Sequence, residues 1–423
     1  MSLPSLSNER ARHGAPLLAA MVITAACSTS EPAQKPSPAP YLFVWAGPHM
    51  GDTAGTSASD FVAVLDADPA SAGYGRVVTS MGAGVAGMMA HHTELTLPVG
   101  QPVFAEDYLA GRIVLLDFAD PTRPRVARQI DSVPGYRRPH SFVRLPNGHV
   151  LATLQFGDGT LPGDPGGLAE FDAAGTLLRT GSSADPAYTD PPVRIYGLDA
   201  FPAIDRVVTT SSPMEMVRTA NVIQVWRLSD LRLLQTIGVP PLAGDSVGSY
   251  PFEIRALPDG KSALFNTYYC GFYLVTGLEG AAPQLTLVHS MRDPRRIGCS
   301  VPTIVGRFWV MPVAYDHSVI SLDISDPAHP VEVSVLRADS TFVPHWSSAD
   351  PGSDRIVITG QDDGEARVLI ARLDPATGEL SWDEGFRDAG ATRLGVSFDR
   401  AAWPHGSVVH AMPHGALFGP AGR

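Results

Sequence analysis

Histidine recurs at one position of a spaced pattern in this chain. Five segments, each beginning six residues before a proline, span residues 92–98, 140–146, 196–202, 252–258 and 345–351. His92, His140 and His345 begin three of these segments, although the chain has only 13 histidines among 423 residues. Neutral imidazole suits copper, zinc, iron and nickel. A repeat that delivers imidazoles to equivalent places therefore predicts a metal site on a symmetric scaffold.

Each of these segments is the first of four strand-like runs. Short runs of β-branched residues bounded by Gly, Pro, Asn and Asp are typical of strands and hairpins, and 41 Gly with 38 Pro suit many tight turns. The segments recur about every 50 residues, which with four strands per unit indicates a β-propeller. Counting the third strands predicts an all-β fold with seven blades.

The two ends of the chain complete the seventh blade. Residues 41–46, 61–66 and 76–81 supply three strands of a blade that lacks its first strand. Residues 403–412 supply that missing strand and place His405 near its start. N-terminal strands plus a C-terminal strand thus close the ring, which removes the exposed edges of an open sheet array.

Ring closure decides which histidines meet. The first strands of propeller blades line the central channel, and blades six, seven, one and two become consecutive. We therefore expect His345, His405, His92 and His140 to converge at one end of the channel. His91 precedes His92 and either turns the other way or joins it at the strand start.

Three carboxylates could also lie near that centre. Glu253 lies across the ring and is predicted to be either a carboxylate that hydrogen-bonds a metal ligand or a catalytic base near the metal. Glu106 and Asp107 are expected to form a solvated pair. His414 is interpreted, with the remaining histidines, as a residue without a role in the site.

Two cysteines follow different strands. Cys270 ends a second strand and Cys299 opens the next blade, so in a four-strand meander both lie on the same face. Three interpretations stay open: a disulfide, which suits an oxidising compartment, two separate buried thiols, or a Cys299 thiol that faces the channel.

The N-terminus reads as an export signal over residues 1–27. A basic start, a short apolar run and small residues precede Cys27, an arrangement typical of bacterial lipoproteins, in which the cysteine is lipidated. Cleavage after Ala26 with a soluble product is the alternative. Residues 28–40 form a Ser/Pro/Ala linker, and residues 41–418 form the propeller. The predicted location is the periplasm with a lipid anchor; otherwise the protein is secreted.

The charge balance limits the partners. A net charge of −12 argues against nucleic acid and against a broad anionic membrane surface. Contact with a membrane is therefore expected only through the lipid anchor.

With these residues laid out, the chain resembles the selenium-binding protein family, which includes the methanethiol oxidases, over most of residues 41–405. The matching pieces are residues 61–69, 91–92, 139–141, 166–172, 222–236, 251–255 and 322–327. The resemblance implies a seven-bladed propeller and, for the oxidase members, copper enzymes that convert methanethiol, O2 and water into formaldehyde, hydrogen sulfide and hydrogen peroxide. It implies copper ligation by His91, His92, His140 and His405.

The chain also departs from that family. No cysteine occurs in residues 93–97 after the histidine pair, and residues 413–418 replace the usual Gly-Gly-Asp-Cys tail. Selenium binding is therefore not expected.

The sequence thus predicts a metal-binding propeller, with copper favoured over zinc or another transition metal, that acts on a small molecule. The predicted activity is oxidation of a small thiol with O2, as in a methanethiol oxidase-like oxidoreductase, with Glu253 as the catalytic residue. Two other classes stay open: a non-enzymatic scaffold that binds a partner or ligand, and a metal-dependent hydrolase such as a lactonase.

Overall fold

The computed structural model describes residues 37–48, 59–86, 89–161, 163–212, 214, 217–242, 249–291, 297–361, 364–400, 402–406 and 409–420. Residues Pro36–Arg423 form one compact unit. The predicted export signal with Cys27, and most of the predicted linker, lie outside the described residues. In the described part of the chain, no helix has the length and apolar character that a membrane crossing requires.

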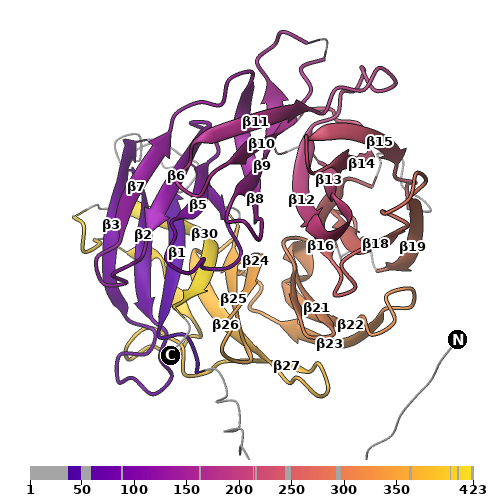
Figure 1. The fold of residues 1–423 in the computed structure, drawn as a ribbon. Coiled ribbons are helices and arrows are strands. Elements are labelled where there is room, and N and C mark those ends of the chain that lie inside the picture. The colour runs from indigo at the N-terminus through magenta and orange to yellow at the C-terminus, as the bar shows by residue number, and fades with distance from the viewer. Residues whose placement is uncertain are drawn as a thin grey trace, which may run out of the picture. The chain divides into compact units, whose positions relative to one another are not determined.

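Seven antiparallel sheets follow one another along the chain (Figure 1). Blade 1 contains β4 (Ala90–Thr93), β5 (Val103–Asp107), β6 (Arg112–Asp117) and β7 (Arg125–Ile130). Blade 2 contains β8 (Tyr136–Arg144), β9 (Val150–Gly157), β10 (Gly167–Phe171) and β11 (Leu177–Ser182). Blade 3 contains β12 (Ile195–Phe201), the 3-10 turn η2 (Pro202–Ile204), β13 (Arg206–Ser211), β14 (Val222–Arg227) and β15 (Arg232–Gly238).

The next three sheets repeat this plan. Blade 4 contains β16 (Pro251–Ala256), β17 (Ala263–Thr267), β18 (Gly271–Thr276) and β19 (Gln284–Ser290). Blade 5 contains β20 (Thr303–Val305), β21 (Phe308–Val313), the 3-10 turn η3 (Ala314–Asp316), β22 (Ser318–Asp323) and β23 (Val331–Arg337). Blade 6 contains β24 (Pro344–Ala349), β25 (Arg355–Gly360), β26 (Arg367–Leu373) and β27 (Leu380–Trp382), and β28 (Val396–Ser397) also pairs with β26.

The closing blade joins the two ends of the chain, and Figure 1 shows yellow β30 beside indigo β1. It contains β29 (Asp399–Arg400), β30 (Val409–Gly419), β1 (Tyr41–Pro48), β2 (Ser59–Asp66) and β3 (Val77–Ala86). The all-β, seven-bladed propeller predicted from the repeat is thereby confirmed.

The closing strand itself begins later than predicted. We expected residues 403–412, but β30 runs from Val409 to Gly419. Its antiparallel register pairs Phe418 with Leu42 and Ala416 with Val44. The run Ala416-Leu417-Phe418 is buried, and burying this apolar run beside β1 outweighs the more polar segment that contains His405.

Burial along the strands explains how the blades stack. Third strands such as β6, β10 and β26 are buried over nearly their whole length, whereas the outer strands β11 and β15 alternate between more and less exposed residues. A middle strand packs against neighbouring blades on both faces, and an outer strand shows one face to water. The core therefore lies between blades. Phe104 of blade 1, for example, has its ring centroid 5.9 Å from those of Phe142 and Phe171 of blade 2.

A buried ion pair, which we call the Arg355 clasp, fastens blade 6 to the start of the chain. Arg355 and Asp350 are both fully buried and paired at 2.6 Å. Arg355 also donates to the carbonyl oxygens of Ala39 and Ala67, which flank strands β1 and β2, and Asp350 accepts the amide of Ala39. The clasp thus holds the N-terminal strands in the position that closes the ring.

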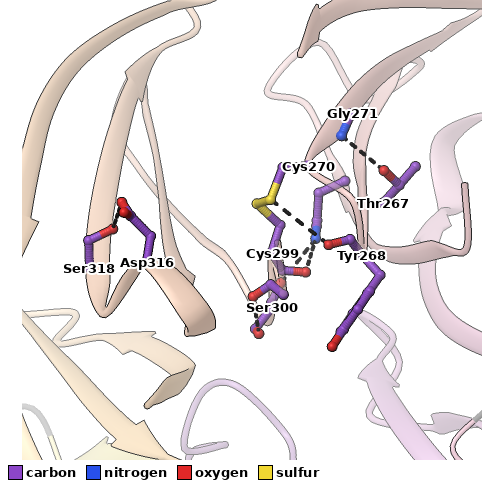
Figure 2. Close-up of a disulfide and its surroundings, with 10 residues drawn as sticks. Thr267, Tyr268, Cys270, Gly271, Cys299, Ser300, Asp316 and Ser318 are labelled. Carbon is purple, nitrogen blue, oxygen red and sulfur yellow. Dashed lines mark hydrogen bonds between the residues drawn. A yellow bond between two sulfur atoms is a disulfide. The ribbon is translucent and has the colours of Figure 1, made fainter. Parts of the chain in front are cut away.

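A disulfide joins blade 4 to blade 5 (Figure 2). Cys270 lies in the turn between β17 and β18, and its Sγ is bonded to that of Cys299. Asn266 donates from Nδ2 to the carbonyl oxygen of Cys299 at 2.8 Å, which adds a second link between the two blades. Of the three interpretations left open by the sequence, the structure has the bonded pair.

Candidate metal centre

Five histidines meet at the first strands of four blades. His91 and His92 lie on β4, His140 on β8, His345 on β24 and His414 on β30. All five are buried. Ring centroids are 4.2 Å apart for His91 and His92, 4.0 Å for His91 and His414, 4.3 Å for His92 and His140, and 4.7 Å for His345 and His414. Blades six, closing, one and two therefore converge as ring closure requires.

Two overlapping groups in this cluster have the geometry to hold an ion. His91, His92, His345 and His414 each offer one ligand atom, and these atoms lie within 4.8 Å of one another. His92, His140 and Glu253 form a second group by the same measure. Since His92 belongs to both groups, they are neighbouring parts of one centre. A set dominated by neutral imidazoles suits copper, zinc, iron or nickel rather than calcium or magnesium.

His405 lies elsewhere. It is half-buried against the outer strand β3, where its Nδ1 is 2.6 Å from the hydroxyl of Ser80 and its ring stands 4.9 Å from that of Phe61. The predicted place of His405 in the centre is taken by His414. The difference follows from the place where β30 begins, because this strand starts at Val409 and carries His414, whereas Trp403 and His405 contact Phe61 and Ser80 of the closing blade.

The sequence does contain a signal for His414. Pro420 follows His414 by six residues, which is the spacing found in the five segments that begin the blades. On the sequence alone, His414 instead has no predicted role in the site, and His405, eight residues before Pro413, is expected at the start of the closing strand. The strict spacing identifies the histidine that joins the buried cluster, which is His414 on β30.

Glu106 orients His91. Its Oε1 is 2.8 Å from His91 Nδ1 and accepts the backbone N–H of His92 at 3.2 Å. An oxygen that accepts in this way favours the His91 tautomer with the proton on Nδ1, which leaves Nε2 for an ion. Glu106 and Asp107, expected to be a solvated pair, are 0% and 1% exposed. That expectation was wrong because β5 is enclosed between the neighbouring sheets.

Ser141 orients two further rings. Its hydroxyl lies 2.9 Å from His140 Nδ1 and 3.3 Å from His92 Nδ1. One hydroxyl can donate to one ring and accept from the other. In the described part of the chain, the Nε2 atoms of His92 and His140 and the Nδ1 of His414 have no hydrogen-bond partner. These atoms are therefore available to a ligand.

Burial keeps the imidazoles neutral. It lowers the pKa of His91, His92 and His414 well below the usual value, and repulsion among the rings lowers it further. Burial likewise lowers the pKa of His140 to about 3. Neutral imidazole is the form that binds metal ions, so no proton has to be removed at neutral pH before an ion can bind.

Glu253 of β16 borders the cluster from the opposite side of the ring. Its Oε2 accepts from Arg255 Nη1 at 2.8 Å, whereas its Oε1 has no partner among the described residues. Burial raises the pKa of Glu253, and the Arg255 charge opposes this rise. A carboxylate oxygen of Glu253 lies within 4.8 Å of ligand atoms of His92 and His140.

A small cavity of about 40 Å³ opens beside His92 and Glu253, which is room for a few water-sized molecules. Trp346 forms part of its wall, with its ring 5.0 Å from that of His92. The cavity is lined by His92, Thr93, Leu95, Ser141, Phe142, Val143, Leu198, Asp199, Glu253, Arg255, Val301 and Trp346. A small molecule with an apolar body fits this lining.

Aromatic rings close the side of the centre that faces blades 3 and 4. The Tyr196 ring lies 3.8 Å from that of His140, and the Phe252 ring lies 4.3 Å from that of Tyr196. Burial raises the pKa of Tyr196 well above its usual value, and the charge of Glu253 adds to this effect. Tyr196 therefore remains a neutral phenol that can donate a hydrogen bond.

Comparison with known proteins relates the chain to one enzyme by sequence. The chain is 27% identical over 323 residues to the methanethiol oxidase of a Hyphomicrobium species, and the match covers 69% of each protein. No family model matches.

Solved structures share the fold. A hypothetical selenium-binding protein of Sulfolobus tokodaii superposes with a TM-score of 0.72 at 15% identity, over 90% of this chain and 94% of the other. The periplasmic gluconolactonase of Pseudomonas aeruginosa superposes with a TM-score of 0.62 at 13% identity, over 90% and 100%. The sequence match supports the predicted distant relationship to the methanethiol oxidases, and the superpositions show that a selenium-binding protein shares the propeller fold.

Proposed function

We propose that this chain, a distant relative of the selenium-binding proteins and methanethiol oxidases, is a periplasmic copper protein that oxidises a small thiol with O2. The observation that carries the proposal is the cluster of five buried histidines, in which ring nitrogens of His92, His140 and His414 have no protein partner among the described residues. A buried polar atom without a partner costs about 1–3 kcal/mol. A cluster of such atoms is expected to persist because something binds to them.

The side chains divide the work of the site. His91, His92, His345 and His414 hold the ion, while Glu106 and Ser141 keep the rings of His91 and His92 oriented. Copper, when bound, supplies the redox chemistry that joins thiol oxidation to O2.

The remaining residues handle the substrate. The cavity beside His92 accepts a small molecule and keeps bulk water away through its apolar wall. Glu253 offers an oxygen to the proton of the thiol, and proton acceptance by such a positioned carboxylate is general base catalysis.

Two features support the compartment. The Cys270–Cys299 disulfide suits an oxidising environment outside the cytoplasm. The export signature at residues 1–27, with Cys27 as the lipidation site, accounts for delivery and anchoring at a bacterial membrane.

Elemental analysis of protein purified from the periplasm tests the proposal. We expect about one copper ion per chain, and loss of that copper on His92→Ala, because His92 belongs to both ligand groups. His405→Ala is the matched control, since His405 lies against Ser80 outside the centre and its loss should leave the copper content unchanged. Copper-free wild-type protein, or equal losses in both variants, would contradict the proposal.

The same measurement separates the competing functions. A hydrolase would retain zinc and turn over lactones, and a scaffold would retain no metal and be indifferent to His92→Ala. The gluconolactonase likeness concerns the fold, which propellers of many activities share. The sequence match to a methanethiol oxidase, rather than the histidine content of the centre, therefore favours the oxidase over the hydrolase.

A further inference from the structure

We propose that Glu253 decides which small molecules bind beside the histidine centre, and that its free oxygen selects neutral hydrogen-bond donors over anions. The inference rests on the proposed metal centre, and it adds the chemical class of ligand that the neighbouring cavity accepts: a small molecule with an apolar body and one O–H, N–H or S–H group.

The carboxylate of Glu253 is held in one orientation. Arg255 donates from Nη1 to Glu253 Oε2 at 2.8 Å and to the carbonyl oxygen of Ile254 at 2.7 Å, and from Nε to the carbonyl oxygen of Pro302 at 3.0 Å. Because the Arg255 guanidinium is fixed by three acceptors on two blades, its hydrogen bond to Glu253 Oε2 is held in place and Oε2 is occupied. Oε1 alone is available, and it has no partner in the part of the chain described.

The Glu253 carboxylate borders the place where a ligand of the centre would sit. One of its oxygens, with ligand atoms of His92 and His140, belongs to a group whose atoms lie within 4.8 Å of one another, and Oε1 is the oxygen that no described residue occupies. The cavity of about 40 Å³ borders the same His92 and Glu253. A molecule of a few heavy atoms that binds next to His92 therefore has Glu253 within reach of a hydrogen bond.

The charges around the cavity disfavour an anion. Its lining includes two carboxylates, Glu253 and Asp199, and one guanidinium, Arg255, while His92 stays neutral. Asp199 is already occupied, since its oxygens accept the backbone N–H groups of Ala200 and Ala256, each at 2.7 Å. An ionised carboxylate can only accept a hydrogen bond. A neutral donor thus satisfies Oε1, whereas an anion is repelled by it.

Glu253→Gln should reverse this preference. Arginine only donates, so the glutamine must turn its carbonyl oxygen toward Arg255 and its NH2 group toward the cavity. The substitution keeps the shape of the side chain, removes the acceptor and places a donor there. Affinity for a neutral donor should fall, and affinity for an anion should rise.

The experiment compares three probes on zinc-loaded protein, in which the metal is redox-inert. Ethanol and dimethyl ether have the same atoms, but only ethanol carries a donor, and azide supplies the anion. By titration calorimetry, we expect wild-type protein to bind ethanol about tenfold more tightly than dimethyl ether, the size of one hydrogen bond to a charged group. In Glu253→Gln that ratio should approach one, and azide should bind about tenfold more tightly than in wild type.

Glu94→Gln is the matched control. Glu94 is also buried and paired with an arginine, but both of its oxygens are occupied by Arg144, with the Phe104 amide as a further donor. Its substitution should leave all three affinities unchanged. Thermal unfolding of each variant checks that it is folded.

The outcomes separate this inference from the proposed function. If wild-type protein and Glu253→Gln both retain zinc and bind all three probes with the same affinities, Glu253 has no role in selection, and the metal centre is unaffected by that result. Failure of wild-type protein to retain any ion overturns the metal centre itself. Should Glu253→Gln not fold, wild-type protein alone still decides, because equal affinities for ethanol and dimethyl ether contradict selection by a free acceptor.

Discussion

The protein buries two polar clusters that differ in how their atoms are paired. In the Arg355 clasp, every side-chain nitrogen of Arg355 and both oxygens of Asp350 have hydrogen-bond partners. In the histidine centre, ring nitrogens of His92, His140 and His414 have none among the described residues. Both clusters are almost completely enclosed, so exposure does not distinguish them.

The difference separates a structural cluster from a binding cluster. A fully paired cluster stabilises only the folded chain, and here it fastens the strands that close the ring. An incompletely paired cluster costs stability, which a ligand can restore. The two are linked, because the ring that the clasp closes is what brings His414 beside His91.

Lowering the pH should affect the histidine centre most strongly. In the unfolded chain, histidine has a pKa of about 6.5, whereas His91, His92, His140 and His414 keep much lower pKa values in the folded, metal-free protein. Below about pH 6.5 these histidines therefore bind protons in the unfolded state but not in the folded state. The free energy of unfolding then falls as the pH falls, by about 1.4 kcal/mol per pH unit for each such histidine.

Urea unfolding of metal-free protein between about pH 7 and pH 5 measures this loss, which should reach several kcal/mol. Above about pH 7 these histidines should contribute no further change. A flat profile across the whole range would show that the rings are not held neutral by burial.

Arg355→Met should produce the next largest effect. It leaves Asp350 buried without its counter-charge, and breaking a buried pair costs about 3–5 kcal/mol. Chemical unfolding measures the loss. The control is Arg218→Met, since Arg218 and its partner Asp190, paired at 3.2 Å, are both largely exposed, so its removal should cost about 1 kcal/mol or less. Equal costs would contradict the distinction between the clasp and a surface pair.

Glu106→Gln should have the smallest effect, and only on the metal. The substitution keeps an oxygen for His91 Nδ1 but removes the carboxylate that raises the basicity of the ring, so metal affinity should fall about tenfold. Competition with a chelator measures the affinity. Glu170→Gln is the control. Glu170 Oε1 lies 2.7 Å from Nδ1 of His149, as Glu106 does from His91, but neither Glu170 nor His149 belongs to the histidine centre. An unchanged metal affinity in Glu106→Gln would show that the Glu106 carboxylate does not strengthen metal binding by His91.

Much of the fold could be predicted because it is a local, repeated property. Each blade carries its own strands, turns and opening residue, so seven third strands and the positions of His92, His140 and His345 follow from the spacing. The closing strand was harder, since it pairs with residues at the other end of the chain. Its true start depends on the burial of Ala416, Leu417 and Phe418 against β1, and local spacing allowed His405 as a competitor.

The sequence by itself determined the blade repeat and the delivery of imidazoles to first strands. Only the tertiary structure decided that His414 completes the cluster, that Glu106 is enclosed rather than solvated, and that Cys270 and Cys299 are bonded. The physical reason is that these features depend on contacts between blades. The alternation of apolar and polar residues along one strand predicts which face of the strand is buried. The residues that contact this face come from another blade, so they are decided only when the blades pack into the ring.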